Sequence, residues 1–327
     1  MQKRRMYYWA GGIVLTGILV FGGLRLITRS IDITNEPGET VRPLLKSPLT
    51  GVECETRDSR PFAVMMSSDR EARPLSGIGE ADLVFEMPVV DTGFTRMMAV
   101  YQCGRPREVG SVRSSRLDFV PLALGVNAIY AHFGGEHEVL AQLNKGIIDN
   151  IDGLKYDEIY YFRKKGIPRP HNSFTNFDLM ATVAGKLNYD MTDSHVSYSH
   201  ETDSQSQGKT EPPPLFNDDF KVIWKYHSET NSYLRSRSGQ PETDTNTGKP
   251  VEAKNVIIMK TIWSPINKDY IRVRTVGSGG LLVYKNGTIV SGTWEKANDK
   301  AKLMFFDQNH KEIPLAPGIT WVEIDAR

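Results

Sequence analysis

An apolar run near the amino terminus is the strongest constraint on how and where this chain can fold. Residues 6–24 are uncharged and rich in Ile, Val, Leu, Gly and aromatic residues, and Lys3, Arg4 and Arg5 precede them. About 20 apolar residues in a helix cross a hydrocarbon core of ~30 Å, so this run is long enough to span a membrane. Basic residues on its amino-terminal side favour a cytoplasmic amino terminus. We therefore expect a single-pass protein of the cell membrane, with a cytoplasmic stub and anchor at residues 1–30 and an extracytoplasmic body.

A cleaved signal peptide is the alternative interpretation of the same run. Such a peptide has a shorter apolar core and small residues at its cleavage site. Residues 24–29 read LRLITR, which is a poor match, and no cysteine stands there for lipid attachment. The sequence therefore favours an anchor that is kept, which would be the contact with the membrane, followed by a polar tether at residues 31–46.

The composition excludes several classes of protein. The 327 residues include 40 Lys and Arg against 39 Asp and Glu, a formal net charge of +1, which gives no support to a nucleic-acid partner. The two cysteines, Cys54 and Cys103, are too few for a disulfide-rich scaffold or a four-cysteine zinc site. Outside the cytoplasm a cysteine pair can stay oxidised, so we expect a Cys54–Cys103 disulfide, with two buried free thiols as the alternative.

Apolar patterns divide the remaining chain into two domains. Residues 47–194 alternate strand-length apolar runs, at 62–66, 83–87, 97–101, 128–133 and 159–162, with helical patterns at 117–124, 136–143 and 177–187. This alternation indicates an α/β domain, with Asn176 as the N-cap of its last helix and Thr175 as the alternative cap. Residues 195–219 have the polar, proline-bearing composition of a linker.

Residues 220–327 show short apolar or alternating runs with no helical pattern between them. Asn286-Gly287 lies between two of these runs and predicts a two-residue hairpin turn. The predicted fold class is therefore an α/β amino-terminal domain and an all-β carboxy-terminal domain, behind one transmembrane helix.

Four arginines gather in residues 105–116 (RPREVGSVRSSR), between a predicted strand and a predicted helix. Backbone amides at a helix start, hydroxyl groups and guanidinium groups together bind phosphate or carboxylate well. The residues expected to bind such an anion are Arg96, Arg113, Ser114, Ser115 and Arg116. The alternative is a solvated basic loop whose arginines pair with nearby carboxylates.

A second basic segment at residues 163–173 (RKKGIPRPHNS) extends the candidate site. Its two prolines stiffen the loop and would present Arg169, His171 and Asn172 at fixed angles. His171 could carry a proton near neutral pH, or it could only brace the loop. The chain has no Walker-type phosphate loop, dinucleotide fingerprint or serine nucleophile elbow, so we name no catalytic residue and expect no cofactor.

Several short segments carry a family resemblance. In the first domain they are residues 47–51 (SPLTG), 60–66 (RPFAVMM), 72–77 (ARPLSG), 81–86 (ADLVFE), 93–96 (GFTR), 109–116 (VGSVRSSR), 128–135 (AIYAHFGG) and 170–172 (PHN). In the second domain they are residues 255–258 (NVII), 276–279 (VGSG), 292–296 (GTWEK) and 317–321 (PGITW). With these segments the chain resembles the YerB-like lipoproteins, a bacterial family of unknown function. The resemblance implies an α/β domain, a β domain and residence in the cell envelope, although such proteins are often lipid-anchored.

The arginine region carries a second resemblance. Asp91, Arg96, residues 113–116 and the glycines at 134–135 follow an order similar to that in LytR-type enzymes, which transfer polyprenyl-pyrophosphate-linked glycopolymers onto the cell wall. That resemblance implies a phosphotransferase in which Asp91 helps to bind Mg²⁺, although Ser114 and Ser115 replace an expected acidic residue. Three functions stay open: a binding protein for an anionic envelope ligand or envelope protein, a LytR-type phosphotransferase, and a non-catalytic assembly module.

Overall fold

The computed structural model describes residues 45–56, 58–192, 196–205, 208–217 and 219–327. The predicted anchor at residues 1–30 and nearly all of the predicted tether lie outside the described residues. Within the described residues, no helix combines the length and the apolar character needed to cross a membrane. The described residues belong to one compact unit of the chain.

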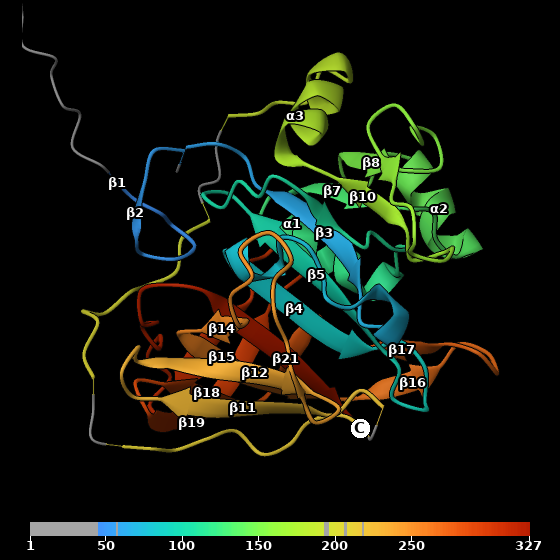
Figure 1. Ribbon diagram of the computed structural model, residues 1–327. Coiled ribbons are helices and arrows are strands. Elements are labelled where there is room, and N and C mark those ends of the chain that lie inside the picture. The colour runs from blue at the N-terminus through green and yellow to red at the C-terminus, as the bar shows by residue number, and fades with distance from the viewer. Residues whose placement is uncertain (1–44, 57, 193–195, 206–207, 218) are drawn as a thin grey trace, which may run out of the picture. The chain divides into compact units, whose positions relative to one another are not determined.

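A ten-stranded mixed sheet runs through both predicted domains (Figure 1). Its strand order is β20-β19-β18-β15-β21-β4-β5-β3-β7-β8. In chain order, these strands are β3 (Phe62–Ser67), β4 (Leu83–Pro88), β5 (Thr95–Tyr101), β7 (Ile129–His132), β8 (Asn150–Asp152), β15 (Asn255–Thr261), β18 (Gly277–Lys285), β19 (Thr288–Lys296), β20 (Met304–Asp307) and β21 (Thr320–Ala326). Strand β21 pairs in parallel with both β15 and β4. The two domains expected from the sequence therefore share one sheet.

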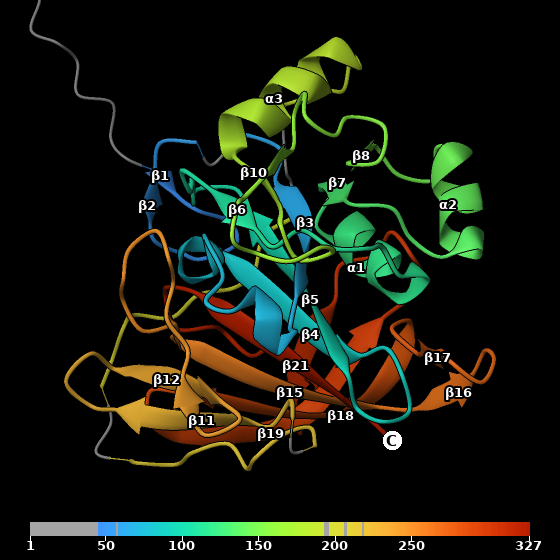
Figure 2. The ribbon, with the colours of Figure 1, turned by 45° about the vertical axis from the view of Figure 1, so that its right-hand side comes forward.

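Both faces of the sheet are buried at its central strands β15, β21, β4, β5 and β3, which explains why these strands are nearly continuous apolar runs. Along β3, Ala63 and Met65 belong to one hydrophobic cluster while Val64 and Met66 belong to the other, as the two-residue period of a strand requires. The helices α1 (Val120–Gly125) and α2 (His137–Asn144) pack in the first cluster. The helix α3 (Phe177–Lys186) and the strands β11 (Val222–His227) and β12 (Ser232–Arg237) pack in the second (Figure 2).

The three predicted helices form near their expected positions. Asn176 caps α3, because its side chain accepts a hydrogen bond from the Leu179 N–H at 2.9 Å, and this confirms the predicted N-cap. The pattern at residues 117–124 is a 3-10 turn, η3 (Leu117–Phe119), followed by α1. Pro121 lies in the first turn of α1, where a residue without an N–H is tolerated, so the α-helix begins later than predicted. The other 3-10 turns of the described residues are η1 (Arg70–Ala72) and η2 (Ile78–Glu80).

Short strands form smaller sheets around the large one. They are β1 (Leu45–Lys46) with β2 (Glu53–Cys54), β6 (Val109–Gly110) and β9 (Phe162–Arg163) on either side of β10 (Ser173–Thr175), β13 (Gln240–Pro241) and β14 (Glu252–Ala253) beside β12, and β16 (Trp263–Pro265) with β17 (Ile271–Val273). The Asn286-Gly287 hairpin is confirmed, since both residues have positive φ and connect β18 to β19. The strand predicted at residues 159–162 is largely wrong. The Tyr160 N–H donates to the Tyr156 carbonyl at 3.0 Å, as in a turn, and the strand includes only Phe162 of that range.

A buried cluster of charges fixes the β11–β12 hairpin to the large sheet. Glu86 of β4 is fully buried and accepts hydrogen bonds from Thr95 Oγ1 at 2.5 Å, from Arg237 Nη2 at 2.6 Å and from Arg235 Nη2. Burial raises the pKa of the Glu86 carboxyl, but the guanidinium groups of Arg237 and Arg235 outweigh that effect and lower it. Glu323 of β21 accepts from Trp224 Nε1 at 2.8 Å and completes the cluster. The two domains are therefore joined by charges that water does not reach.

The predicted disulfide between Cys54 and Cys103 is confirmed. Their Cα atoms lie 5.8 Å apart, within the range of disulfides in proteins. The bond ties β2 to the segment that follows β5, and the alternative of two free thiols is wrong.

Candidate functional site

Arg96 is a buried arginine at the start of β5. Its side chain is only 3% exposed, and its Nε and Nη1 atoms have no hydrogen-bond acceptor among the described residues. Burial and the neighbouring Arg113 lower the pKa of the Arg96 guanidinium to about 9. A buried N–H without an acceptor costs free energy, so this side chain is poised to receive an acceptor from a ligand.

Arg113 and Arg116 lie beside it because their segment crosses the ends of two neighbouring strands. The Arg113 N–H donates to the Met65 carbonyl near the end of β3, and the Arg113 carbonyl accepts from the Phe133 N–H just after β7. Since β3 and β7 are parallel, the segment lies across their carboxyl ends. Arg113 Nε and Arg116 Nε are buried and, in the described part of the chain, also have no acceptor. The Arg116 guanidinium stacks over the Tyr270 ring at 4.6 Å from its centroid.

Asp69 is the acidic residue on which the side chains of Arg96, Arg113 and His171 converge. Its Oδ2 atom lies 3.6 Å from Arg96 Nη1, 3.8 Å from Arg113 Nε and 3.6 Å from His171 Nδ1. These distances are too long for hydrogen bonds, although the charges attract. Ser67 Oγ donates to the same carboxylate at 2.5 Å and fixes its direction. We call the group Arg96, Arg113, Arg116, Asp69 and His171 the arginine site.

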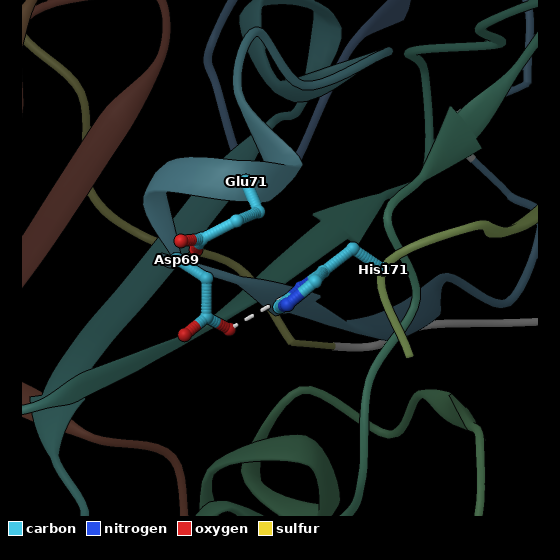
Figure 3. A group of neighbouring side chains, drawn as sticks. All are labelled: Asp69, Glu71 and His171. Carbon is cyan, nitrogen blue, oxygen red and sulfur yellow. Dashed lines mark ion pairs between the residues drawn. The ribbon is translucent and has the colours of Figure 1, made fainter. Parts of the chain in front are cut away.

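His171 reaches the arginine site from the loop between β9 and β10, and Figure 3 shows its ring directed at Asp69. The His171 N–H donates to the Pro168 carbonyl at 2.8 Å, which holds the loop in a tight turn. Asn172 accepts from Arg163 Nη1 at 3.0 Å and so braces the loop from behind. Arg169 is exposed, and among the described residues no ion pair or hydrogen bond joins it to the site.

The two serines of the predicted anion site differ in their surroundings. Ser115 is fully buried, and its hydroxyl group lies 3.0 Å from the Tyr130 hydroxyl. Ser114 is partly exposed between the two arginines. The structure therefore brings together Arg96, Arg113, Arg116 and His171 of the predicted residues. It places Ser115 in the core beneath them.

Three residues could offer ligand atoms to a metal ion. Atoms of Asp69, Glu71 and His171 lie within 4.8 Å of one another (Figure 3). Arg96 and Arg113 approach the same Asp69 oxygen, and their charges oppose a further cation there. Asp91, the metal residue of the LytR resemblance, is exposed in the turn before β5, and within the described residues no ion pair links it to the site.

A cavity of about 660 Å³ borders the arginine site. Asp69 and Glu71 line it, together with Arg73, Met97 and Trp321. Cavities of this volume hold small organic ligands. Asp69 thus lies between a group of unpaired guanidinium N–H donors and a space that can accept the remainder of a ligand.

Sequence reasoning missed Asp69 and Tyr270. Asp69 had a usable signal, since Ser68 and Asp69 are polar residues directly after a buried strand that ends at Ser67. Residues at the carboxyl ends of strands in α/β sheets are a common source of binding groups. Tyr270 had no such signal, because it comes from the loop between β16 and β17, far along the chain.

With this fold and site, the chain belongs to the DUF3048 family. Models described as "Protein of unknown function (DUF3048) N-terminal domain" and "Protein of unknown function (DUF3048) C-terminal domain" match residues 49–190 and 215–322. One relative is the "Putative lipoprotein YerB" of Bacillus subtilis (strain 168), which is 31% identical in an alignment of 297 residues that covers 86% of each chain. A crystal structure of the YerB protein from Bacillus subtilis has a TM-score of 0.77 at 28% identity and covers 86% of this chain and 96% of that one. The predicted resemblance to the YerB-like lipoproteins is confirmed.

Proposed function

We propose that this chain is an envelope protein whose α/β domain binds a phosphate- or pyrophosphate-bearing ligand at the arginine site. One observation carries the proposal: Arg96, Arg113 and Arg116 each hold a buried Nε without an acceptor in the described chain, within one small group. Guanidinium groups form paired hydrogen bonds with phosphate oxygens, and these bonds are stronger than neutral ones. A phosphate group would supply the missing acceptors and would offset the burial and the repulsion from Arg113 that lower the pKa of Arg96.

Calorimetry with inorganic pyrophosphate on the full chain in detergent tests this proposal. Arg113→Lys and Arg116→Lys should each weaken binding, because an ammonium group cannot reproduce the geometry of the guanidinium fork. Loss of one charged hydrogen-bond partner costs about 1.5–3 kcal/mol, or roughly ten- to hundredfold in affinity.

Arg105→Lys is the matched control. The Arg105 guanidinium stacks over the Phe177 ring at 4.4 Å from its centroid and lies outside the arginine site. Equal affinities for the wild type and the Arg113 and Arg116 variants would refute the proposal, as would no binding by the wild type. Thermal melts would show that each variant is folded.

The LytR-type phosphotransferase is the second candidate, and the carboxylates of Asp69 and Glu71 beside the arginine site favour it. Magnesium could bridge these carboxylates and a bound pyrophosphate only if the anion neutralised the arginines first. Magnesium should then bind tightly in the presence of pyrophosphate and weakly without it. Equal magnesium affinity with and without pyrophosphate would exclude this candidate.

We also propose a single membrane span with the described body outside the cytoplasm. The apolar run at residues 6–24 and the name of the relative, a lipoprotein, support an attachment to the membrane. Ser204 is exposed, so a Ser204→Cys variant in intact cells with an accessible inner membrane should react with a membrane-impermeant thiol reagent. Reaction seen only after lysis would place the body in the cytoplasm.

A further inference from the structure

We propose that His171 is a nucleophile that attacks a phosphoric monoester held in the arginine site, so that the site transfers phosphoryl groups through a phosphohistidine. This inference rests on the proposed function and adds chemistry to it. It assigns a reacting atom, His171 Nε2, and a substrate class, the phosphoric monoesters.

Asp69 lies at one end of the imidazole ring of His171. Asp69 Oδ2 faces His171 Nδ1 at 3.6 Å, and Nδ1 is buried with no hydrogen-bond partner in the described chain (Figure 3). A carboxylate in this position holds the proton on Nδ1 and leaves the lone pair of the ring on Nε2. Hydrogen bonds of catalytic pairs are often long before the substrate binds, so 3.6 Å is compatible with this role.

The imidazole ring of His171 also has no structural hydrogen bond to any other described residue. The loop is held by the backbone N–H of His171 and by Asn172, not by the imidazole. His132 is a useful contrast, because its ring nitrogens lie 2.8 Å from the Gly134 carbonyl oxygen and 3.3 Å from Asn150 Oδ1 in the core. His132 therefore has the contacts of a bracing histidine, and His171 does not.

The charges around the ring support the same role. Asp69 Oδ2, which faces the ring, also lies 3.6 Å from Arg96 Nη1 and 3.8 Å from Arg113 Nε, so both guanidinium groups share this carboxylate with the imidazole. The same arginines carry the unpaired N–H groups that would hold the phosphoryl oxygens and stabilise the charge of the transition state.

The reaction balances with water as the only co-reactant. A bond forms between His171 Nε2 and phosphorus while the bond between phosphorus and the ester oxygen breaks, and the ester oxygen leaves with the electron pair. Water then attacks the phosphohistidine, the P–N bond breaks, and Nε2 regains its lone pair as inorganic phosphate leaves. The proton of the water passes to the solvent or to the departed oxygen.

The test uses p-nitrophenyl phosphate, whose leaving group needs no proton from the protein, and the full chain in detergent at pH 7. After an alkaline quench, mass spectrometry of the intact protein should show the addition of one HPO₃ group, and peptide mapping should place it on His171. The adduct should disappear in acid, as phosphohistidine does. Release of p-nitrophenolate should accompany it.

Three variants make the test specific. His171→Asn should abolish the adduct while its thermal melt stays that of the wild type, and His137→Asn, at an exposed histidine of α2, should form the adduct as the wild type does. Asp69→Asn should slow formation of the adduct by about a hundredfold or more, because its amide no longer sets the proton on Nδ1.

Each other outcome overturns the inference. Release of p-nitrophenolate without an adduct would make His171 a general base at most, and an adduct on another residue would exclude it as the nucleophile. Phosphate binding with neither adduct nor turnover would refute the inference and leave the proposed binding function standing. No phosphate binding by the wild type would refute both.

Discussion

Replacing Glu86 by glutamine removes the negative charge on which the two buried arginines of β12 depend. Glu86, Arg235 and Arg237 are each at most 2% exposed, so water cannot solvate the guanidinium groups that lose their partner. Glu242 and Glu323 stay nearby and retain part of the compensation. We therefore expect a large loss of stability even though the glutamine side chain has nearly the same shape.

The magnitude follows from the burial of the cluster. Removing one partner of a buried ion pair costs about 3–5 kcal/mol, and the remaining carboxylates place this change at the lower end, near 3 kcal/mol. For a protein of this size such a loss corresponds to a drop in Tm of about 4–5 °C. Urea denaturation of the full chain in detergent, followed by circular dichroism, measures the free energy of unfolding.

Two comparisons make the result decisive. Asp91→Asn removes a charge from an exposed turn, so it should change the free energy of unfolding by less than about 0.5 kcal/mol. In the double variant of Glu86→Gln with Arg237→Gln, part of the loss should be recovered, because one unpaired charge is removed. If the free energies of unfolding of Glu86→Gln and Asp91→Asn differ by less than about 1 kcal/mol, the buried arginines do not depend on the charge of Glu86.

Three further predictions concern stability. Replacing both Cys54 and Cys103 by serine should lower the free energy of unfolding by about 4 kcal/mol, because the disulfide no longer limits the chain entropy of the loop that it closes. Thiol counting on the denatured wild type should find no free thiol. Burial raises the pKa of Asp118 from 3.8 to about 7, so folding favours the protonated form of its carboxyl group. The contribution of this group to the free energy of unfolding is therefore present at low pH and is lost as the pH rises through about 7. The free energy of unfolding, followed from pH 5 to pH 8, should therefore fall in the wild type relative to Asp118→Asn, and parallel curves would contradict the assignment. Asn176→Ala should cost about 1 kcal/mol through loss of the N-cap of α3, and no change in Tm would show that the cap is unimportant.

The sequence predicted the features that depend on neighbouring residues. The N-cap at Asn176, the hairpin at Asn286-Gly287 and the positions of α2 and α3 follow from local patterns of a few residues. The same holds for Arg113 and Arg116, which stand out in a short run. These interactions are local, so a single sequence contains most of the information.

The features that the sequence could not supply depend on pairings between distant segments. Strand β21 lies between β15 and β4, and nothing in its own seven residues indicates a parallel partner more than two hundred residues earlier. Asp69 joins the arginines only because β3 and β5 pair with Ser67 opposite Arg96. In the sequence, Glu86 is a single polar residue in an apolar strand, and its role in the buried charge cluster is apparent only from its arginine partners in the folded chain. Each of these contacts depends on the register between strands, and that register is set by the folded sheet.

The central place of β21 bears on how the protein is made. Until residues 320–326 have been synthesised, β4 and β15 each present an unpaired edge, and such edges invite pairing with other chains. The strands that come before β21 along the chain therefore cannot complete the sheet until β21 has been synthesised. A chain shortened by its last strand would be left with two half-sheets, so we expect it to be degraded or to aggregate. Completion of the sheet thus depends on residues 320–326, and a tag fused after them must leave this strand free to insert between β15 and β4.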